Sequence, residues 1–124
     1  MDKNVNKSAV SRAIISKITS ERSPKEIRTD HLDGFKKPVH VASLKSSNSF
    51  IPDIEVVYEN SNIVYEIELN NNLEIEKWQS FSKYVKQKNG SFYLVVPKQM
   101  KERVKKELDE KDVNAGVITF VTPY

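Results

Sequence analysis

The sequence contains no cysteine among its 124 residues. Disulfide frameworks, zinc–thiolate sites, iron–sulfur clusters and cysteine nucleophiles are therefore excluded. It also lacks a long apolar run, and its first residues, MDKNVNKS, are polar, so neither a membrane span nor a signal peptide is recognisable. These absences predict a soluble, cytoplasmic protein with no membrane partner. The length suits one domain, and we expect a single domain over residues 1–124 with residues 1–7 flexible.

Lysine and arginine are missing from the centre of the chain. Residues 46–76 balance at −7, whereas residues 1–45 and 77–124 each balance at +5. The central acids are Asp53, Glu55, Glu59, Glu66, Glu68, Glu74 and Glu76. Carboxylates that hold a divalent metal between basic flanks that attract phosphate would give this pattern. On charge alone, an ordinary lysine-rich surface is the simpler explanation.

Residues 50–69 read as a β-hairpin that carries most of these acids. Apolar and acidic residues alternate on both sides of a polar turn at residues 59–62, which is the period of a strand. With the loop centred there, Asp53 lies opposite Glu68 and Glu55 opposite Glu66. Like charges in facing positions destabilise a sheet. Either this face is solvated or a cation lies on it.

The other expected elements follow from apolar spacing and from turn residues. They are a helix over residues 8–21, a helical turn after a capping box at 23–26, a first strand over 38–45, a helix capped at Asn71 and running to 89–90, a buried strand over 92–96, a helix over 98–111 and a buried strand over 116–122. Three consecutive strands followed by crossover helices predict a mixed sheet covered on both faces.

This element order, with Pro52-Asp53 on the second strand and Glu66-Ile67-Glu68 on the third, resembles the PD-(D/E)xK nuclease superfamily. The resemblance implies a restriction-endonuclease-like α/β fold, with an α-β-β-β-α-β core and a mixed sheet, followed here by a further helix and strand. It covers nearly the whole chain by element order, although the motif itself is a handful of residues. The implied activity is metal-dependent hydrolysis of phosphodiester bonds in DNA, with Mg²⁺ or Mn²⁺ as cofactor.

Glu68 stands where the superfamily motif has lysine. Some restriction endonucleases that resemble this chain also carry glutamate there. The missing cation can come from another element, and Lys77, in the opening turn of the following helix, is the first candidate. Lys45, at the end of the expected first strand, is the second. Alternatively, the fold is retained and the chemistry is lost.

The motif residues have roles that their chemistry supports. Asp53 and Glu66 are hard oxygen ligands suited to Mg²⁺, which would polarise the phosphoryl group and lower the pKa of an attacking water. Glu68 would complete the metal shell or orient that water. Glu21 resembles in position an acid of the first helix that some members use as an additional ligand, and a plain surface acid is the simpler reading. Ile67 would offer its backbone carbonyl.

The remaining polar residues receive simpler interpretations. Glu55 is expected to be peripheral. His31 and His40 lack the spacing of a metal pair, so we expect surface or hydrogen-bonded histidines. The expected nucleic-acid surface is the basic set Lys3, Lys7, Arg12, Lys17, Arg22, Lys25, Arg28, Lys36 and Lys37, which would bind phosphates without sequence choice.

Three functions remain open from the sequence. The first is a metal-dependent nuclease acting on DNA, and the second is an inactive nuclease-like fold that binds nucleic acid or serves in an assembly. The third is an α/β domain without a nucleic-acid role, which a one-residue shift of the hairpin register would favour because Asp53 and Glu66 would then lie on opposite faces. A homodimer or a subunit of a larger assembly is compatible with each.

Overall fold

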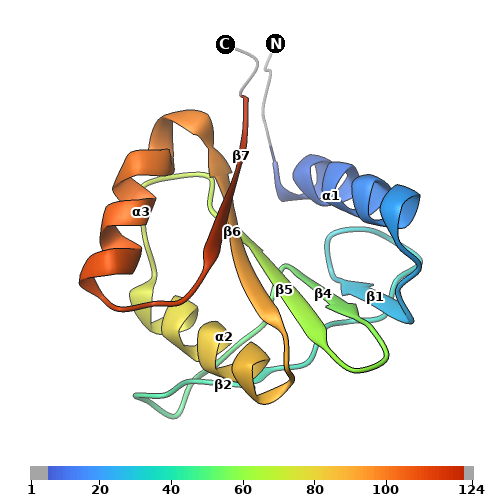
Figure 1. The fold of residues 1–124 in the computed structure, drawn as a ribbon, viewed down its shortest axis with the longest axis horizontal. Coiled ribbons are helices and arrows are strands. Elements are labelled where there is room, and N and C mark those ends of the chain that lie inside the picture. Colours follow the sequence, from blue (N-terminus) through green and yellow to red (C-terminus); the bar gives the residue numbers. More distant parts are fainter. Residues whose placement is uncertain (1–5, 122–124) are drawn as a thin grey trace.

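The computed structural model describes residues 6–121 and is an α/β fold built on a mixed sheet (Figure 1). Its elements are α1 (Lys7–Glu21), β1 (Glu26–Thr29), β2 (Val41–Ala42), β3 (Ser49–Phe50), β4 (Ile54–Val57), β5 (Asn62–Ile67), α2 (Ile75–Gln87), β6 (Ser91–Pro97), the 3₁₀ turn η1 (Lys98–Met100), α3 (Lys101–Glu110) and β7 (Gly116–Phe120). None of the helices within these residues combines the length and the apolar character needed to cross a membrane.

The sheet has five strands in the order β1-β4-β5-β6-β7. β1, β4 and β5 pair antiparallel, whereas β5, β6 and β7 pair parallel and are connected through α2 and α3. α1 covers one face, and α2 and α3 cover the other (Figure 1). The predicted mixed sheet with helices on both faces is therefore confirmed.

The first helix is confirmed and begins earlier than expected. The side chain of Asn6 caps it by accepting a hydrogen bond from the Ala9 N–H at 2.8 Å. Lys7 is its first residue, and Ile15 and Ile18 pack against the sheet. Asn6 and Lys7 are thus structured parts of the fold, although they were expected to be flexible. Residues 1–5 of that segment lie outside the described residues.

The expected position of the first strand was wrong. The strand that pairs with β4 is β1, which lies where a helical turn was expected. Glu26, the presumed capping residue, instead pairs its carboxylate with Arg28 and Lys36. Residues 38–45 contribute only β2, which joins β3 in a separate two-stranded sheet beside α2. A four-residue strand that contains one strongly apolar residue, Ile27, leaves little periodic signal in the sequence.

The central hairpin is confirmed, but its register differs by two residues from the expected one. Glu55 faces Val64, and Val57 faces Asn62. The turn is tighter than expected because the Tyr58 N–H already donates to the carbonyl of Ser61 at 2.8 Å. A shift of two residues keeps every side chain on its predicted face. Glu55 and Glu66 therefore still share one face of the sheet.

That acidic face is buried, so the solvated-face interpretation was wrong. Glu55 and Glu66 are 0% and 1% exposed, beneath α2. The cations beside them come from outside residues 46–76, with Arg28 pairing with Glu55 and Lys77 with Glu66. The positive charge that the sequence demanded is thus supplied by the protein's own side chains.

The second helix places its predicted apolar stripe on the sheet. Trp78, Phe81 and Val85 are buried, as expected. The helix begins at Ile75 after Glu74, which makes no capping hydrogen bond with its side chain, so the expected cap at Asn71 was wrong. Asn89 takes the left-handed conformation after the helix, with φ 57°.

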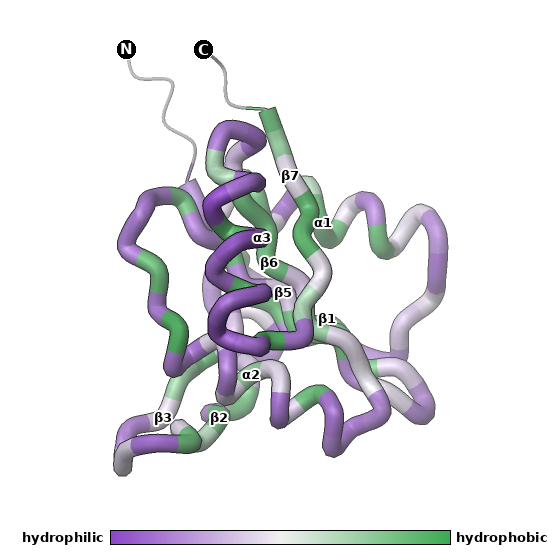
Figure 2. Tube along the Cα trace, turned by 60° about the vertical axis from the view of Figure 1, so that its left-hand side comes forward, coloured by the Kyte–Doolittle hydropathy of each residue, from purple (hydrophilic) through white to green (hydrophobic). Residues whose placement is uncertain are grey.

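The last two elements are confirmed in type. α3 buries Val104 and Leu108, while its remaining turns are predominantly hydrophilic (Figure 2). β7 was expected to be buried, but it is the edge strand of the sheet and Ile118 is 39% exposed. Residue 122, the predicted end of that strand, lies outside the described residues.

Candidate functional site

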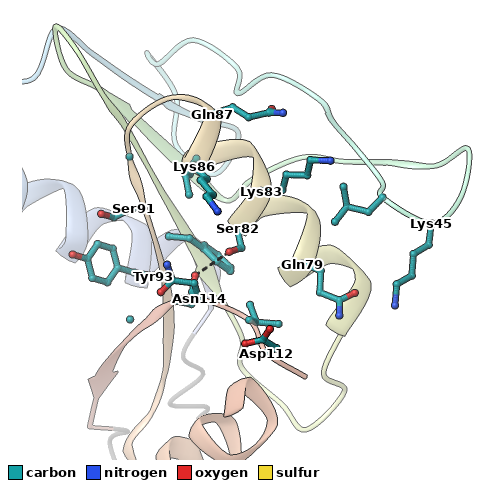
Figure 3. A pocket seen from close by; sticks show the side chains of 17 residues that line it. Lys45, Gln79, Ser82, Lys83, Lys86, Gln87, Ser91, Tyr93, Asp112 and Asn114 are labelled. Atoms are coloured by element: carbon teal, nitrogen blue, oxygen red, sulfur yellow. Dashed lines mark hydrogen bonds between the residues drawn. The ribbon is translucent and has the colours of Figure 1, made fainter. Parts of the chain in front are cut away.

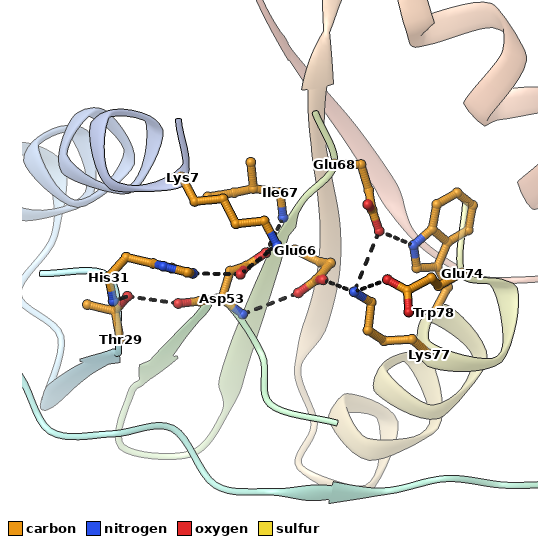
Figure 4. A network of polar contacts seen from close by, with 10 residues as sticks. All are labelled: Lys7, Thr29, His31, Asp53, Glu66, Ile67, Glu68, Glu74, Lys77 and Trp78. Carbon is orange, nitrogen blue, oxygen red and sulfur yellow. Dashed lines mark hydrogen bonds and ion pairs between the residues drawn. The ribbon is translucent and has the colours of Figure 1, made fainter. Parts of the chain in front are cut away.

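The candidate site lies at the carboxyl end of the central strand β5, beside the first turns of α1 and α2 (Figure 4). β4 runs antiparallel to β5, so Asp53, directly before β4, reaches the same edge as Glu66 near the end of β5. In α/β folds, ligands bind at the carboxyl ends of the parallel strands. The hairpin therefore delivers two motif acids to the edge at which binding is expected.

Asp53 is a fixed and ionised carboxylate. Its Oδ2 accepts the Ile67 N–H at 2.7 Å, and its Oδ1 lies 2.7 Å from His31 Nε2. Lys7 Nζ lies 3.1 Å from both oxygens. Burial acts to raise the pKa of Asp53, but the Lys7 charge and the hydrogen bonds from Ile67 and His31 outweigh it and lower that pKa.

Glu66 lies beside Asp53 in the opposite electrostatic situation. Its Oε1 accepts the Asp53 N–H at 3.2 Å, and its Oε2 lies 2.5 Å from Lys77 Nζ. Burial, together with the neighbouring Asp53 charge, raises the pKa of Glu66 to about 8 although Lys77 acts in the other direction. Two adjacent carboxyl groups with separated pKa values are typical of sites that divide acid and base roles.

Lys77 is the cation that the sequence placed first. Its ammonium lies 2.5 Å from Glu66, 2.9 Å from Glu74 and 3.9 Å from Glu68, and its side chain is 11% exposed. Burial alone would lower the pKa of Lys77, but the pairing with Glu66 outweighs it and raises that pKa. Lys77 is therefore charged and positioned by three carboxylates.

Lys45, the second candidate for that cation, lies elsewhere. It is exposed on the β2–β3 connection and lines an open hollow beside α2, together with Lys83, Lys86 and Asp112 (Figure 3). None of the motif acids lines that hollow. The structure therefore associates Lys77, and not Lys45, with the acidic site.

Glu68 is buried but turns toward α2. Its Oε2 accepts a hydrogen bond from Trp78 Nε1 at 2.8 Å, and burial raises its pKa. Glu68 thus forms the far side of the Lys77 network and does not contact Asp53 (Figure 4). The three motif acids share one network without converging on one point.

Glu21 lies apart from this network. It is the last residue of α1, whose first residue, Lys7, contacts Asp53. Fourteen residues of helix separate these positions by about 21 Å. The structure therefore does not bring Glu21 to the motif acids, and we do not include it among the candidate ligands.

Two residues at the site were missed in the sequence. Lys7 was assigned to a flexible segment and to the phosphate-binding surface, and His31 was expected to be a surface or hydrogen-bonded histidine. Both reach Asp53, because the Ser8 hydroxyl donates to the carbonyl of His31 at 3.0 Å and joins α1 to this loop. Neither has a motif partner nearby in sequence, so no local signal could identify them. His40 is exposed, as expected.

Glu55, expected to be peripheral, belongs to a second buried network. Its carboxylate accepts from Arg28 at 3.2 Å and Asn62 at 2.9 Å, and the Tyr84 hydroxyl donates to it. Asn62 begins β5 and Tyr84 lies near the end of α2, whereas Arg28 lies on β1. Glu55 is therefore a buried polar residue with satisfied hydrogen bonds, separate from the Asp53–Glu66 pair.

The donor set suits a small site for a hard cation. Within residues 6–121, no three His, Cys, Asp or Glu side chains are close enough to form a metal-binding group. Proteins commonly hold Mg²⁺ through one or two carboxylates, with waters and substrate phosphates completing the shell, and Asp53 and Glu66 would be the residues to hold it here. The lysine ammoniums against these carboxylates mark where positive charge is favoured.

Comparisons with known proteins identify no relative. A scan of protein-family models, a search of curated proteins and a search of solved structures each give no match. The chemistry and geometry of the site therefore carry the inference of function.

The raised pKa of Glu66 makes stability depend on pH. The folded protein retains this proton up to about pH 8, whereas an unperturbed glutamate ionises near 4.5, so the contribution of Glu66 to stability is lost as pH rises between these values. Glu66→Gln avoids that loss. Without metal, we expect the variant to be more stable than wild type by about 1–3 kcal/mol at pH 9 and similar at pH 5.

Urea denaturation at both pH values measures this difference. Glu74→Gln is the matched control, because Glu74 pairs with the same Lys77 but its side chain is 50% exposed. It should show no comparable gain at pH 9. An equal gain in both variants would contradict the assignment of the raised pKa to Glu66.

Proposed function

We propose that this protein is a metal-dependent nuclease that hydrolyses phosphodiester bonds, with DNA as its substrate. The observation that carries the proposal is the buried Asp53–Glu66 pair with Lys77 against it at the carboxyl end of β5. Two hard carboxylates and a fixed ammonium are the groups that metal-assisted phosphoryl chemistry requires.

The order of the elements supports the same proposal. α1 precedes three strands that pair as the antiparallel set β1-β4-β5, and α2 then leads to the parallel strand β6. This agrees with the α-β-β-β-α-β order of the restriction-endonuclease-like fold, to which α3 and β7 would be additions. Pro52-Asp53 stands directly before β4, and Glu66-Ile67-Glu68 spans the end of β5, so both segments lie beside the strands that would carry the motif in that fold.

Each residue has a distinct role in this proposal. Asp53 and Glu66 would hold Mg²⁺ or Mn²⁺, which when bound supplies Lewis-acid polarisation of the phosphoryl group and a more acidic water. Lys77 keeps Glu66 oriented and offers positive charge to the negative phosphoryl oxygens. Glu68, held by Trp78, keeps the Lys77 ammonium within the network.

Part of the predicted basic surface is available for nucleic acid. Arg22 lies over the Tyr58 ring, and Arg28 pairs with Glu26 and Glu55, so both have partners within the protein. Lys3 lies outside the described residues. The members that are exposed near α1 and β1 are Arg12, Lys17, Lys25 and Lys37; Lys36 is also exposed but pairs with Glu26. These side chains suit phosphate contacts, which give affinity without sequence choice.

A nucleic-acid-binding or assembly module without catalysis is the alternative. The observation that favours it is the internal neutralisation of the motif acids, because Lys7 pairs with Asp53 and Lys77 with Glu66. Such a protein would bind DNA equally well with and without divalent metal. Metal binding at Asp53 therefore separates the two functions.

The proposed function predicts that millimolar Mg²⁺ or Mn²⁺ raises the melting temperature of the wild type. A metal present at about 100 times its Kd stabilises the folded state by about 2.7 kcal/mol, equivalent to a shift of several degrees. Asp53→Asn should abolish the shift, whereas Asp109→Asn, an exposed residue of α3, should retain it. No shift in the wild type would favour the module without catalysis.

A further inference from the structure

The two lysines at the site are held differently (Figure 4). Lys77 is 11% exposed and lies within 4 Å of three carboxylates. Lys7 is 35% exposed, and within residues 6–121 its ammonium hydrogen-bonds only to Asp53, with both contacts at 3.1 Å. A half-exposed ion pair contributes little stability, because water and salt screen it. Lys7 is therefore the more readily displaced cation.

Asp53 does not need Lys7 to keep its orientation. The Ile67 N–H and His31 Nε2 each contact one of its oxygens at 2.7 Å. The backbone of His31 is itself fixed, because its amide N–H donates to Thr29 Oγ1 at 3.1 Å and its carbonyl accepts a hydrogen bond from the Ser8 hydroxyl. Displacement of the Lys7 ammonium would leave a preorganised carboxylate behind.

The backbone of Lys7 is also independent of this ion pair. Lys7 is the first residue of α1, and the capping hydrogen bond of that helix comes from Asn6. The long side chain can therefore change rotamer without unwinding the helix. The backbone of Lys7 is therefore fixed, while its ammonium can move.

We propose that Lys7 is an exchangeable counter-ion of the site. Its ammonium neutralises Asp53 while no divalent metal is bound, and it passes to a phosphate oxygen of the nucleic acid when the metal takes Asp53. This inference rests on the proposed function and assigns Lys7 to substrate binding at that same site. A metal and an ammonium cannot share the two Asp53 oxygens without repulsion. The incoming phosphodiester then gives Lys7 a new negatively charged partner in place of Asp53.

The exchange predicts opposite effects on the two ligands. Lys7→Met removes the competing charge but keeps an apolar stem of similar length, so the metal should bind about fivefold more tightly in the absence of nucleic acid. The same variant loses a phosphate contact, so the KM for DNA should rise about three- to tenfold while kcat stays within about threefold. If Lys7 had a purely structural role, its substitution would weaken the binding of metal and of DNA together.

Two further variants control for charge and for folding. Lys17→Met removes the same charge from an exposed position of α1, and it should leave the metal Kd within about twofold of wild type. Lys7→Arg keeps a cation that pairs well with carboxylate, so it should bind metal no more tightly than wild type. Calorimetric titration with Mn²⁺ alone gives the metal Kd of all four proteins.

The outcomes separate this inference from the proposed function. Tighter Mn²⁺ binding by Lys7→Met alone, with a raised KM, supports the exchange. If the wild type binds Mn²⁺ and Lys7→Met binds it equally or more weakly, the exchange is overturned but the proposed function stands. Absence of Mn²⁺ binding in all four proteins overturns the proposed function and the exchange with it.

Discussion

Glu66→Gln should abolish metal-dependent DNA cleavage in a protein that is at least as stable as the wild type. The amide keeps the shape of the side chain but cannot carry the negative charge that a divalent cation requires. Loss of one of two metal carboxylates should reduce the cleavage rate by at least about 10³-fold. The same substitution relieves the cost of burying a carboxyl group with a pKa of about 8.

Nicking of supercoiled plasmid with Mg²⁺ or Mn²⁺ measures this loss. The stability gain ensures that lost cleavage does not reflect unfolding. Glu74→Gln is again the control, because it contacts Lys77 at 2.9 Å from the exposed side of the network and should cleave at near wild-type rates. Persistent cleavage by Glu66→Gln would point to a contaminating nuclease or to a different site.

Lys77→Met should have the second largest effect. It removes the ammonium from a site where Glu66 and Glu68 are buried, so both carboxyl groups would be protonated or unpaired. We expect a loss of about 10²–10⁴ in cleavage rate and of about 1–3 kcal/mol in stability at pH 8. The stability loss should shrink toward pH 5, where protonation removes the unpaired charge.

A compensating substitution tests the position of this charge. Glu68 Oε2 lies 3.9 Å from the Lys77 ammonium, so a lysine at position 68 would reach the same space from β5. Glu68→Lys combined with Lys77→Met should recover part of the cleavage that Lys77→Met loses. Cleavage by Lys77→Met at the wild-type rate would show that this ammonium has no role in the reaction.

The sequence predicted the parts of the site that local pattern controls. Alternation along β4 and β5 placed Glu55 and Glu66 on one face, and this survived a two-residue error in register because strand faces repeat every two residues. Asp53 lies directly before β4, so it is beside Glu66 but pairs with Lys7 of α1. Helical spacing placed Lys77 at the start of α2 with its charge toward the acids. These elements are long or strongly periodic, so sequence neighbours decide them.

The parts that were missed depend on contacts between distant segments. β1 is short and was taken for a helical turn, so the loop that carries His31 could not be placed beside Asp53. Lys7 reaches Asp53 across 46 positions of sequence. Glu21 failed as a candidate ligand because the direction of α1 brings its first residue, not its last, to the site.

The sequence offered two explanations for the acidic face of the hairpin, solvation or a bound cation. Neither anticipated that the protein's own basic side chains would neutralise it. Arg28, Lys7 and Lys77 all lie outside residues 46–76, and each pairs with at least one of the acids. The absence of lysine and arginine from a segment shows only that its acids have no basic partner nearby in sequence. Packing of α1, β1 and α2 around the hairpin supplies the rest.

Anomalous diffraction from crystals grown with Mn²⁺ tests the central claim most directly. The proposal predicts one Mn²⁺ ion about 2.1 Å from a carboxylate oxygen of Asp53 and from one of Glu66, with Lys7 displaced from Asp53 and Lys77 still against Glu66. An anomalous peak elsewhere, or none at this edge of the sheet with Lys7 still paired to Asp53, would contradict it.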